Sequence, residues 1–329
     1  MLGRSRSYGS TAMPPASSIF APGVLEGRTA LITGGGTGLG KAAARELLAC
    51  GARVLICGRR SEVLEAACAE LGEGCAWLAG DVREPAECER IVDATLERFG
   101  RLDTLVNNAG GQYFVPAEAI ALRGFQAVTR LNVGATLEMA RAAYERALRP
   151  GGGGMVVNVT LSPHHGLPGM THSSAARAAV EGLTRELAEA WAPDDVAVCA
   201  VAAGHFETEA IQKYPESVKA GAARSVPLGR LGRPDEHAWL IALLATPLGR
   251  RFSGSVITLD GARDNWFGPW PPPTLTGRIH GRLMDARNAK VRISCVDLKC
   301  STSGKGHLGD TRRQSAPQEV AANERLFLN

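Results

Sequence analysis

Seven short apolar runs recur between residues 29 and 260 and alternate with longer segments that have helical spacing. Runs of this kind, flanked by helices, are typical of parallel β-strands that are buried on both faces of a sheet. The runs are TALIT (29–33), RVLIC (53–57), CAWLAG (75–80), LDTLVNN (102–108), MVVNV (155–159), VAVCAV (196–201) and SVITLD (255–260). The sequence therefore predicts an α/β fold, a single doubly wound domain with a mostly parallel sheet.

The alternation is confined to the middle of the chain, which divides the sequence into three parts. Residues 1–22 are rich in Ser, Pro and Ala and predict a flexible arm. Residues 23–268 form the predicted folded domain. Residues 269–329 begin with a proline run, become basic and show no sustained periodicity, so we expect them to be a disordered tail.

Charge and composition argue against several classes of function. From Pro271 to Asn329 there are ten Lys and Arg and five Asp and Glu, so the rest of the chain, with 27 against 28, is close to neutral. A body that binds nucleic acid would need a basic face. No apolar run approaches the ~18 residues of a membrane span, and the eight cysteines have neither a CxxC motif nor a metal-like spacing from histidine. We therefore expect a cytoplasmic protein with reduced thiols and no metal, nucleic-acid or membrane partner.

The stretch TGGGTGLG (33–40) directly follows the first apolar run and opens a helical segment. Glycines in such a turn let the backbone approach a pyrophosphate, whose charge then meets the helix N-terminus. A simple turn between a strand and a helix would not need Gly34, Gly36, Gly38 and Gly40 together. We therefore expect a dinucleotide to bind here, at Gly34, Gly36, Thr37, Gly38, Leu39 and Gly40.

The second apolar run ends in CGRR (57–60), where an acidic residue would bind the ribose hydroxyls of NAD. No acid is present, and Arg59 and Arg60 follow instead. A guanidinium group at this place suits a 2′-phosphate. The pattern favours NADP(H) over NAD(H), with two solvated surface arginines as the alternative reading.

With these residues in place, the chain from about Gly23 to Gly268 resembles the short-chain dehydrogenase/reductase family. The resemblance rests on TGGGTGLG, GDV (80–82), NNAG (107–110), LNV with Asn132, the long helix from Ser173 and the closing ITLDG. Finer likeness, in NNAGGQYFVPAEA, HSSAARAAVEGLTRELAEAWAP and PLGRLGRPDE, is to the peroxisomal trans-2-enoyl-CoA and 2,4-dienoyl-CoA reductase branch, and also to bacterial oxidoreductases of acyclic terpenoids. The resemblance implies a single Rossmann domain, NAD(P)(H), a small-molecule substrate such as an acyl-CoA, and a homotetramer.

The resemblance also implies roles for particular positions of this sequence. Beyond the glycine turn and the two arginines, the implied cofactor contacts are Asp81, Val82, Asn108, Ala109, Gly110, Arg177 and Thr208. The implied catalytic positions are Asn132, Thr160, Ser173 and Arg177. Thr160 and Ser162 both remain open for the family's serine, because the loop length does not fix the register. Ser173 stands where the family has tyrosine, and Arg177 stands where it has lysine.

These last two departures change which chemistry the site suits. A phenol has a pKa near ~10 and can be tuned toward neutrality, whereas an alkanol is a far weaker acid. Arg177 can hold a ribose and supply positive charge, but it cannot release a proton. Carbonyl reduction is therefore the reaction that this site suits least. Reduction of an activated C=C bond needs donors for an enolate oxygen, and Thr160 or Ser173 can donate without ionising.

Three residues are candidates for the acid that the missing tyrosine would have provided. His164 and His165 follow the fifth apolar run, and Tyr113 follows the NNAGGQ stretch. The plainer reading of each is a solvated loop histidine or an aromatic ring that packs at the mouth of the pocket. Glu181 lies one helical turn beyond Arg177, and we expect it on the surface.

The sequence thus predicts an NADP(H)-dependent short-chain oxidoreductase that reduces an activated C=C bond, for example in a 2-enoyl thioester. Two alternatives stay open. The first is a dinucleotide-binding sensor or partner protein that has lost catalysis, which the intact glycine turn and the altered catalytic positions also fit. The second is an oxidoreductase of an acyclic terpenoid alcohol or aldehyde, which shares the fold but lacks the usual tyrosine.

Overall fold

The computed structural model describes residues 16–265 except 163, 165, 168, 210 and 212–220. The predicted tail, the first fifteen residues of the predicted arm and His165 lie outside the described residues. The chain forms a seven-stranded sheet in the order β3-β2-β1-β4-β5-β6-β7, and every adjacent pair is parallel. The strands are β1 (Thr29–Thr33), β2 (Arg53–Gly58), β3 (Cys75–Ala79), β4 (Thr104–Asn107), β5 (Gly154–Leu161), β6 (Val196–Ala203) and β7 (Val256–Leu259). Each predicted run is a strand, which confirms the doubly wound sheet.

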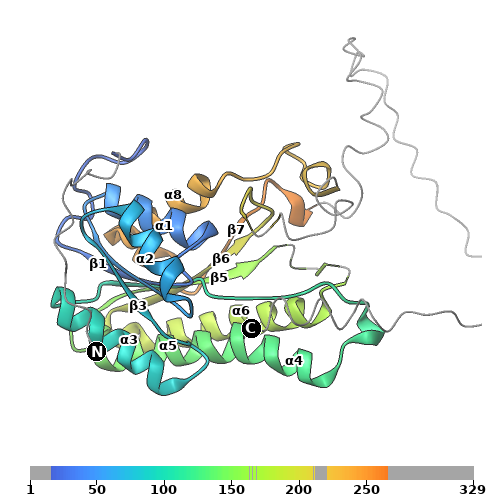
Figure 1. Ribbon diagram of the computed structural model, residues 1–329, viewed down its shortest axis with the longest axis horizontal. Helices are drawn as coiled ribbons and strands as arrows, with labels where there is room; N and C mark the ends of the chain where they lie inside the picture. Colours follow the sequence, from blue (N-terminus) through green and yellow to red (C-terminus); the bar gives the residue numbers. More distant parts are fainter. Residues whose placement is uncertain are drawn as a thin grey trace, which may run out of the picture.

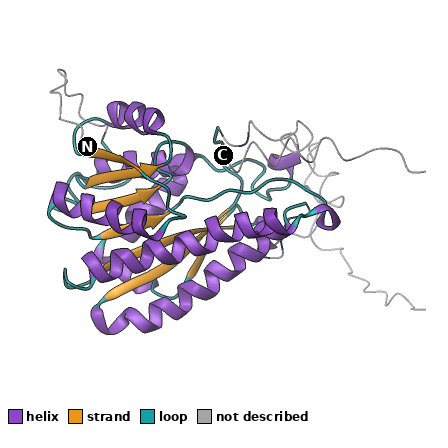
Figure 2. Cartoon of the chain, turned by 60° about the horizontal axis from the view of Figure 1, so that its bottom comes forward, coloured by secondary structure: helices purple, strands orange, loops and turns teal. Residues whose placement is uncertain are grey.

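Helices cover both faces of this sheet (Figure 1 and Figure 2). One layer contains α1 (Gly38–Ala49), α2 (Ser61–Leu71) and α8 (Pro234–Ala245), and the other contains α3 (Pro85–Phe99), α4 (Leu122–Thr129), α5 (Ala135–Ala143) and α6 (Thr171–Trp191). Within the described part of the chain, no helix combines the length and the hydropathy that a membrane span requires.

Two apolar cores lie on the opposite faces of the sheet because successive strand residues point to opposite sides. Ile32 and Ile56 belong to the core beneath α1, α2 and α8, whereas their neighbours Leu31 and Leu55 belong to the core beneath α3, α5 and α6. All four are at most 2% exposed. Full burial of such a side chain stabilises the fold by roughly 1.5–3 kcal/mol, which explains why these strands are apolar without interruption.

The contacts of the folded unit extend into the segment assigned to the arm. Phe20 packs on the core of the α1 face, and the Ser17 hydroxyl donates a hydrogen bond to Glu46 Oε1 at 2.5 Å. Residues from Ser17 onward are therefore attached to the domain.

The sheet order places the functional region at its carboxyl edge. β1 and β4 are neighbours, yet the chain leaves β1 toward one face and β4 toward the other. Open α/β sheets bind ligands in the crevice that forms at such a switch point. The loops after β1, β4, β5 and β6 therefore meet at one place.

Candidate active site

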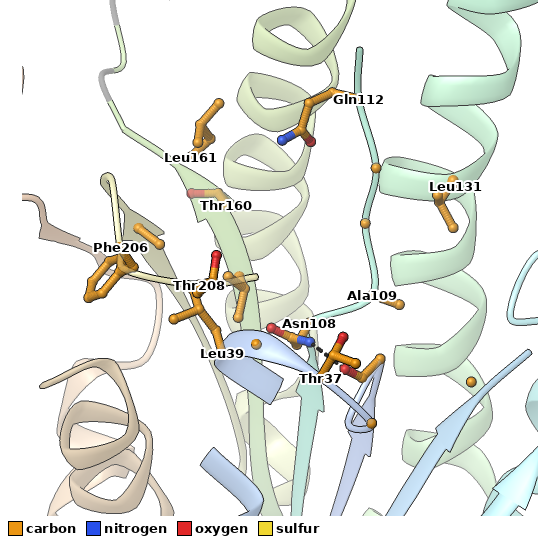
Figure 3. Close-up of a pocket in the computed structure, with 18 of the residues that line it drawn as sticks. Thr37, Leu39, Asn108, Ala109, Gln112, Leu131, Thr160, Leu161, Phe206 and Thr208 are labelled. Atoms are coloured by element: carbon orange, nitrogen blue, oxygen red, sulfur yellow. Dashed lines mark hydrogen bonds between the residues drawn. The ribbon is translucent and has the colours of Figure 1, made fainter. Parts of the chain in front are cut away.

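A cavity of about 480 Å³ opens at this carboxyl edge. Figure 3 shows side chains that enter it from the start of α1, the loop after β4, the end of β5 and the loop after β6. The predicted cofactor residues that line it are Gly34, Gly36, Thr37, Gly38, Leu39, Arg59, Arg60, Asp81, Val82, Asn108, Ala109, Gly110, Arg177 and Thr208. Gly40 is not among the lining residues, but it packs against Gly34 and Asn108, which are. The structure thus brings the predicted cofactor residues together around a single cavity.

The glycine turn has the geometry of a phosphate cradle. Gly34 and Gly38 have φ values of +66° and +54°, a region that favours glycine. A Cβ atom on Gly40 would lie 2.5 Å from both Gly34 O and Asn108 Nδ2, so only glycine fits there. Thr37, the N-cap residue of α1, makes no side-chain capping bond. The first amides of α1 are therefore available to an anion, and the turn fits a dinucleotide pyrophosphate.

Hydrogen bonds between the ends of β1 and β4 hold this cradle in place. Asn108 Nδ2 donates to Thr33 O at 3.0 Å and to Gly34 O at 3.2 Å. In return, Thr33 Oγ1 accepts from the amides of Asn108 and Ala109 at 3.0 and 2.9 Å. The loop after β4 is thus fixed against the glycine turn before any ligand binds.

Basic side chains gather at the adenosine end of the cavity. Arg59 and Arg60 are exposed and line it. Arg83 binds Asp81 through two nitrogens, with Nε 2.9 Å from both carboxylate oxygens. The hydrogen bond from Arg83 lowers the pKa of Asp81, and the charge of Arg59 acts in the same direction. Asp81 is therefore an ionised side chain that is already paired, beside two exposed guanidinium groups.

Thr160 stands at the opposite end of the cavity, near the end of β5 (Figure 3). Its hydroxyl donates to Glu181 Oε1 at 3.3 Å, and the same oxygen lies 3.0 Å from His164 Nε2. Ser162, the alternative position for the family's serine, does not line the cavity, and its hydroxyl binds Asp260. Of these two positions, Thr160 is therefore the one that lines the cavity.

Glu181 is 8% exposed, so the prediction of a surface residue was wrong. It lies four residues after Arg177 and therefore shares the helix face that Arg177 turns to the end of β5. That i, i+4 spacing is the sequence signal that could have placed it next to the site.

Arg177 is held rigidly between β5 and the loop after β4. Its Nη1 atom donates to Val159 O at 2.8 Å. A Cβ atom on Gly110 would lie 2.5 Å from Arg177 Nη2 and 2.7 Å from Asn132 Oδ1, so the loop passes close over the guanidinium group. The site therefore contains a fixed positive charge at its floor.

Asn132 is fully buried and does not line the cavity. It lies in a π-helical turn, Arg130–Gly134, between α4 and α5. Its Nδ2 atom donates to Gly111 O and Val128 O, both at 2.8 Å, and its Oδ1 atom accepts from the Gly111 amide at 3.2 Å. Asn132 therefore positions the loop that ends in Gln112, and its side chain is not part of the cavity lining.

Ser173 also lies away from the cavity. It is fully buried, and its hydroxyl has no hydrogen-bond partner among the described residues. The neighbouring His172 is equally buried, and the Tyr113 ring packs on it with 4.4 Å between centroids. Burial lowers the pKa of His172. The structure therefore separates Ser173 and Tyr113 from the lining that contains Thr160.

A profile of a family described as enoyl-(acyl carrier protein) reductase matches residues 34–262. The chain belongs to the short-chain dehydrogenase/reductase family. The peroxisomal 2,4-dienoyl-CoA reductase of Rattus norvegicus, designated (3E)-enoyl-CoA-producing, is 33% identical over 283 residues, which cover 84% of this chain and 94% of that protein.

Solved structures extend the likeness to the fold. The citronellol catabolism dehydrogenase AtuB of Pseudomonas aeruginosa PAO1 is 37% identical, with a TM-score of 0.67, and covers 75% of this chain and 99% of its own. The 3-ketoacyl-(acyl-carrier-protein) reductase of Brucella melitensis, solved with NADH, is 29% identical, with a TM-score of 0.69, and covers 73% of this chain and 99% of its own. The protein is thus an oxidoreductase of this family, whose structural relatives include one with a bound nicotinamide dinucleotide.

Two further lining residues were not predicted. Gln112 enters the cavity from the loop after β4, and its amide points toward the side where Leu161 and Thr160 lie (Figure 3). His205 lines the cavity after β6, and burial lowers its pKa to about 4, which keeps it neutral near pH 7. Gln112 lies two residues after the NNAG motif, and His205 lies three residues before Thr208. Their closeness to predicted cofactor contacts is the sequence signal that could have placed them in the cavity. Among the described residues, no group of His, Cys, Asp and Glu could hold a metal ion.

Proposed function

We propose that the protein is an NADP(H)-dependent reductase of an activated C=C bond in a conjugated enoyl or dienoyl thioester. One observation carries the proposal: the described residues that line the cavity include no tyrosine and no lysine, but they do include Thr160, Gln112 and Arg177. Hydrogen-bond donors and a fixed cation suit a reaction that develops an oxyanion without needing a phenol. The rat relative's name, a dienoyl-CoA reductase, agrees with this class of substrate.

The chain's own residues divide the work as follows. A reduced nicotinamide dinucleotide held at the glycine turn would supply a hydride for the alkene carbon distant from the carbonyl group. Gln112 donates an amide N–H toward the resulting enolate oxygen, and the positive charge of Arg177 stabilises the enolate from the floor of the cavity. Thr160 lies across the cavity from Gln112, at the end of β5 (Figure 3). One donor of this kind typically contributes ~2.7–4 kcal/mol to the transition state.

The preference for NADP(H) rests on the adenosine end of the cavity. Asp81 is already paired with Arg83, while Arg59 and Arg60 line the cavity where a 2′-phosphate would lie. Arg59→Ala should therefore weaken NADPH binding by about 10- to 100-fold, the loss of one hydrogen bond to a charged group. NADH binding should not change. Arg185→Ala, an exposed arginine on α6, is the matched control, and equal losses for both cofactors would refute the assignment.

The reaction itself is tested with a panel of substrates and NADPH. Crotonyl-CoA and a 2,4-dienoyl-CoA should be reduced, whereas simple ketones should not. NADPH binding without consumption on any substrate would favour the sensor that has lost catalysis. The similarity to AtuB makes a terpenoid oxidoreductase the second candidate, and turnover of citronellol or citronellal in place of thioesters would favour it.

A further inference from the structure

A continuous line of polar contacts connects the surface with Thr160. Asp264 Oδ2 lies 2.6 Å from His164 Nδ1, and Asp264 Oδ1 accepts from the His164 amide at 2.5 Å. On the other side of the ring, His164 Nε2 lies 3.0 Å from Glu181 Oε1, which also accepts from Thr160 Oγ1 at 3.3 Å. The side chains of Asp264 and His164 are 22% and 30% exposed, whereas that of Glu181 is 11% exposed. Exposure is therefore greatest at His164 and falls through Glu181 to Thr160.

The proposed reaction needs this kind of connection. Each turnover places one proton on the α-carbon, and the described lining has no phenol or ammonium group to provide it. Thr160 lines the cavity and its hydroxyl contacts Glu181, but an alkanol is too weak an acid to act alone. It can transfer its proton only if another group replaces that proton in the same step.

We propose that His164 is the proton source of the site and acts through Glu181 and Thr160. The inference rests on the proposed function. The enolate α-carbon takes the proton of the Thr160 hydroxyl and forms a C–H bond. Thr160 Oγ1 regains a proton from the Glu181 carboxyl group, which has received it from Nε2 of protonated His164. The neutral imidazole then takes a proton from solvent, while Asp264 holds the ring at Nδ1.

The placement of each group fits this role. A histidine ring donates from both nitrogens when it is protonated, and here each ring nitrogen faces a carboxylate oxygen. The backbone bond to Asp264 fixes the loop that carries the ring against the segment after β7. The Thr160 hydroxyl, at the end of β5, and the Glu181 carboxylate, on α6, are joined by a hydrogen bond. Thr160 is the catalytic residue in this scheme, and Glu181 and His164 act through it.

Glu181→Gln tests the relay because glutamine keeps the size and the acceptor oxygen but cannot carry the proton. The variant should lower kcat by about 100-fold, the lower range of general-acid effects, with KM unchanged. The solvent deuterium isotope effect on kcat should rise, and the isotope effect of 4-deuterated NADPH should fall toward one, because proton delivery becomes rate-limiting. Glu186→Gln, an exposed position on the same helix, is the control. Unchanged kcat and isotope effects in Glu181→Gln would overturn the relay.

His164→Gln is a second variant, on a partly exposed loop, and should reproduce the kinetic signature of Glu181→Gln with NADPH affinity unchanged. Side-chain ¹⁵N spectra of the cofactor-free protein give a readout apart from activity. Glu181→Gln should shift the His164 Nε2 resonance, and Glu186→Gln should not; an unshifted resonance would contradict the contact. If the wild-type protein reduces the thioester and both variants are fully active, the relay is refuted but the proposed function is not. If the wild-type protein binds NADPH but reduces no conjugated thioester, both the proposed function and the relay are refuted.

Discussion

Gly40→Ala is the sharpest test of the cofactor cradle, because the added Cβ atom favours the helix by propensity but collides with the glycine turn. In a free helix, alanine is favoured over glycine by about 1 kcal/mol. In α1, however, the new Cβ would lie 2.5 Å from both Gly34 O and Asn108 Nδ2. Such overlap costs about 1–3 kcal/mol, and displacing Asn108 weakens its bonds to Thr33 O and Gly34 O, worth about 1 kcal/mol each. We therefore expect a net loss of about 2–4 kcal/mol in the free energy of unfolding.

Calorimetry and NADPH titration measure the two consequences. The Tm should fall by roughly 5–10 °C for a domain of this size, and NADPH affinity should fall at least tenfold because the turn that meets the pyrophosphate is distorted. Gly182→Ala is the control: it lies within α6, and among the described residues no atom beyond the adjacent helix backbone lies within 4 Å of the added Cβ. That substitution should leave NADPH affinity unchanged and raise the Tm slightly. Wild-type Tm and affinity in Gly40→Ala would refute the packing argument.

Three further outcomes follow from single side chains. Thr160→Val should lower kcat by about 10²–10³-fold with NADPH affinity intact, and Thr160→Ser should restore most of it, as steady-state kinetics will show. Ser173→Ala should leave kcat unchanged and leave the free energy of unfolding equal or higher, because the buried hydroxyl has no partner among the described residues; a large loss of kcat would return Ser173 to the active site. Burial lowers the pKa of His237 from 6.5 to about 4, so the unfolded chain takes up its proton first and stability falls as pH drops from 6.5 to 4. Between pH 6.5 and 4, the free energy of unfolding measured in urea should fall by about 3 kcal/mol less for His237→Leu than for wild type. An identical pH dependence of stability in the two proteins would exclude the buried imidazole as the cause.

The fold could be read from the sequence because burial on both faces of the sheet leaves a clear pattern. Neighbours such as Leu31 and Ile32 must both be apolar when one faces α3 and the other faces α1. That requirement marks the inner strands most strongly, whereas the edge strands β3 and β7 are only partly buried. The glycine turn was predictable for a similar reason, since Gly34 and Gly40 occupy positions where a side chain is strained or collides.

The catalytic end was less predictable because it depends on which way each side chain turns. Thr160, in β5, and Ser162, just beyond its end, point to the same side by spacing, and only the structure shows that Thr160 lines the cavity while Ser162 binds Asp260. Ser173 matches the family's tyrosine by position, but the shorter side chain stays within the packed interior. Glu181 follows the pattern of a solvated helix face, yet it turns toward Thr160 and His164. The homotetramer and the cytoplasmic location stay predictions.

The position of the transferred hydride tests the central claim most directly. The protein would be incubated with 4-deuterated NADPH and a conjugated dienoyl thioester, and the product examined by NMR. The account predicts deuterium on a former alkene carbon distant from the carbonyl group, with the thioester intact. Deuterium on a carbinol carbon, formed from a ketone or aldehyde while the thioester stays unreduced, would contradict it.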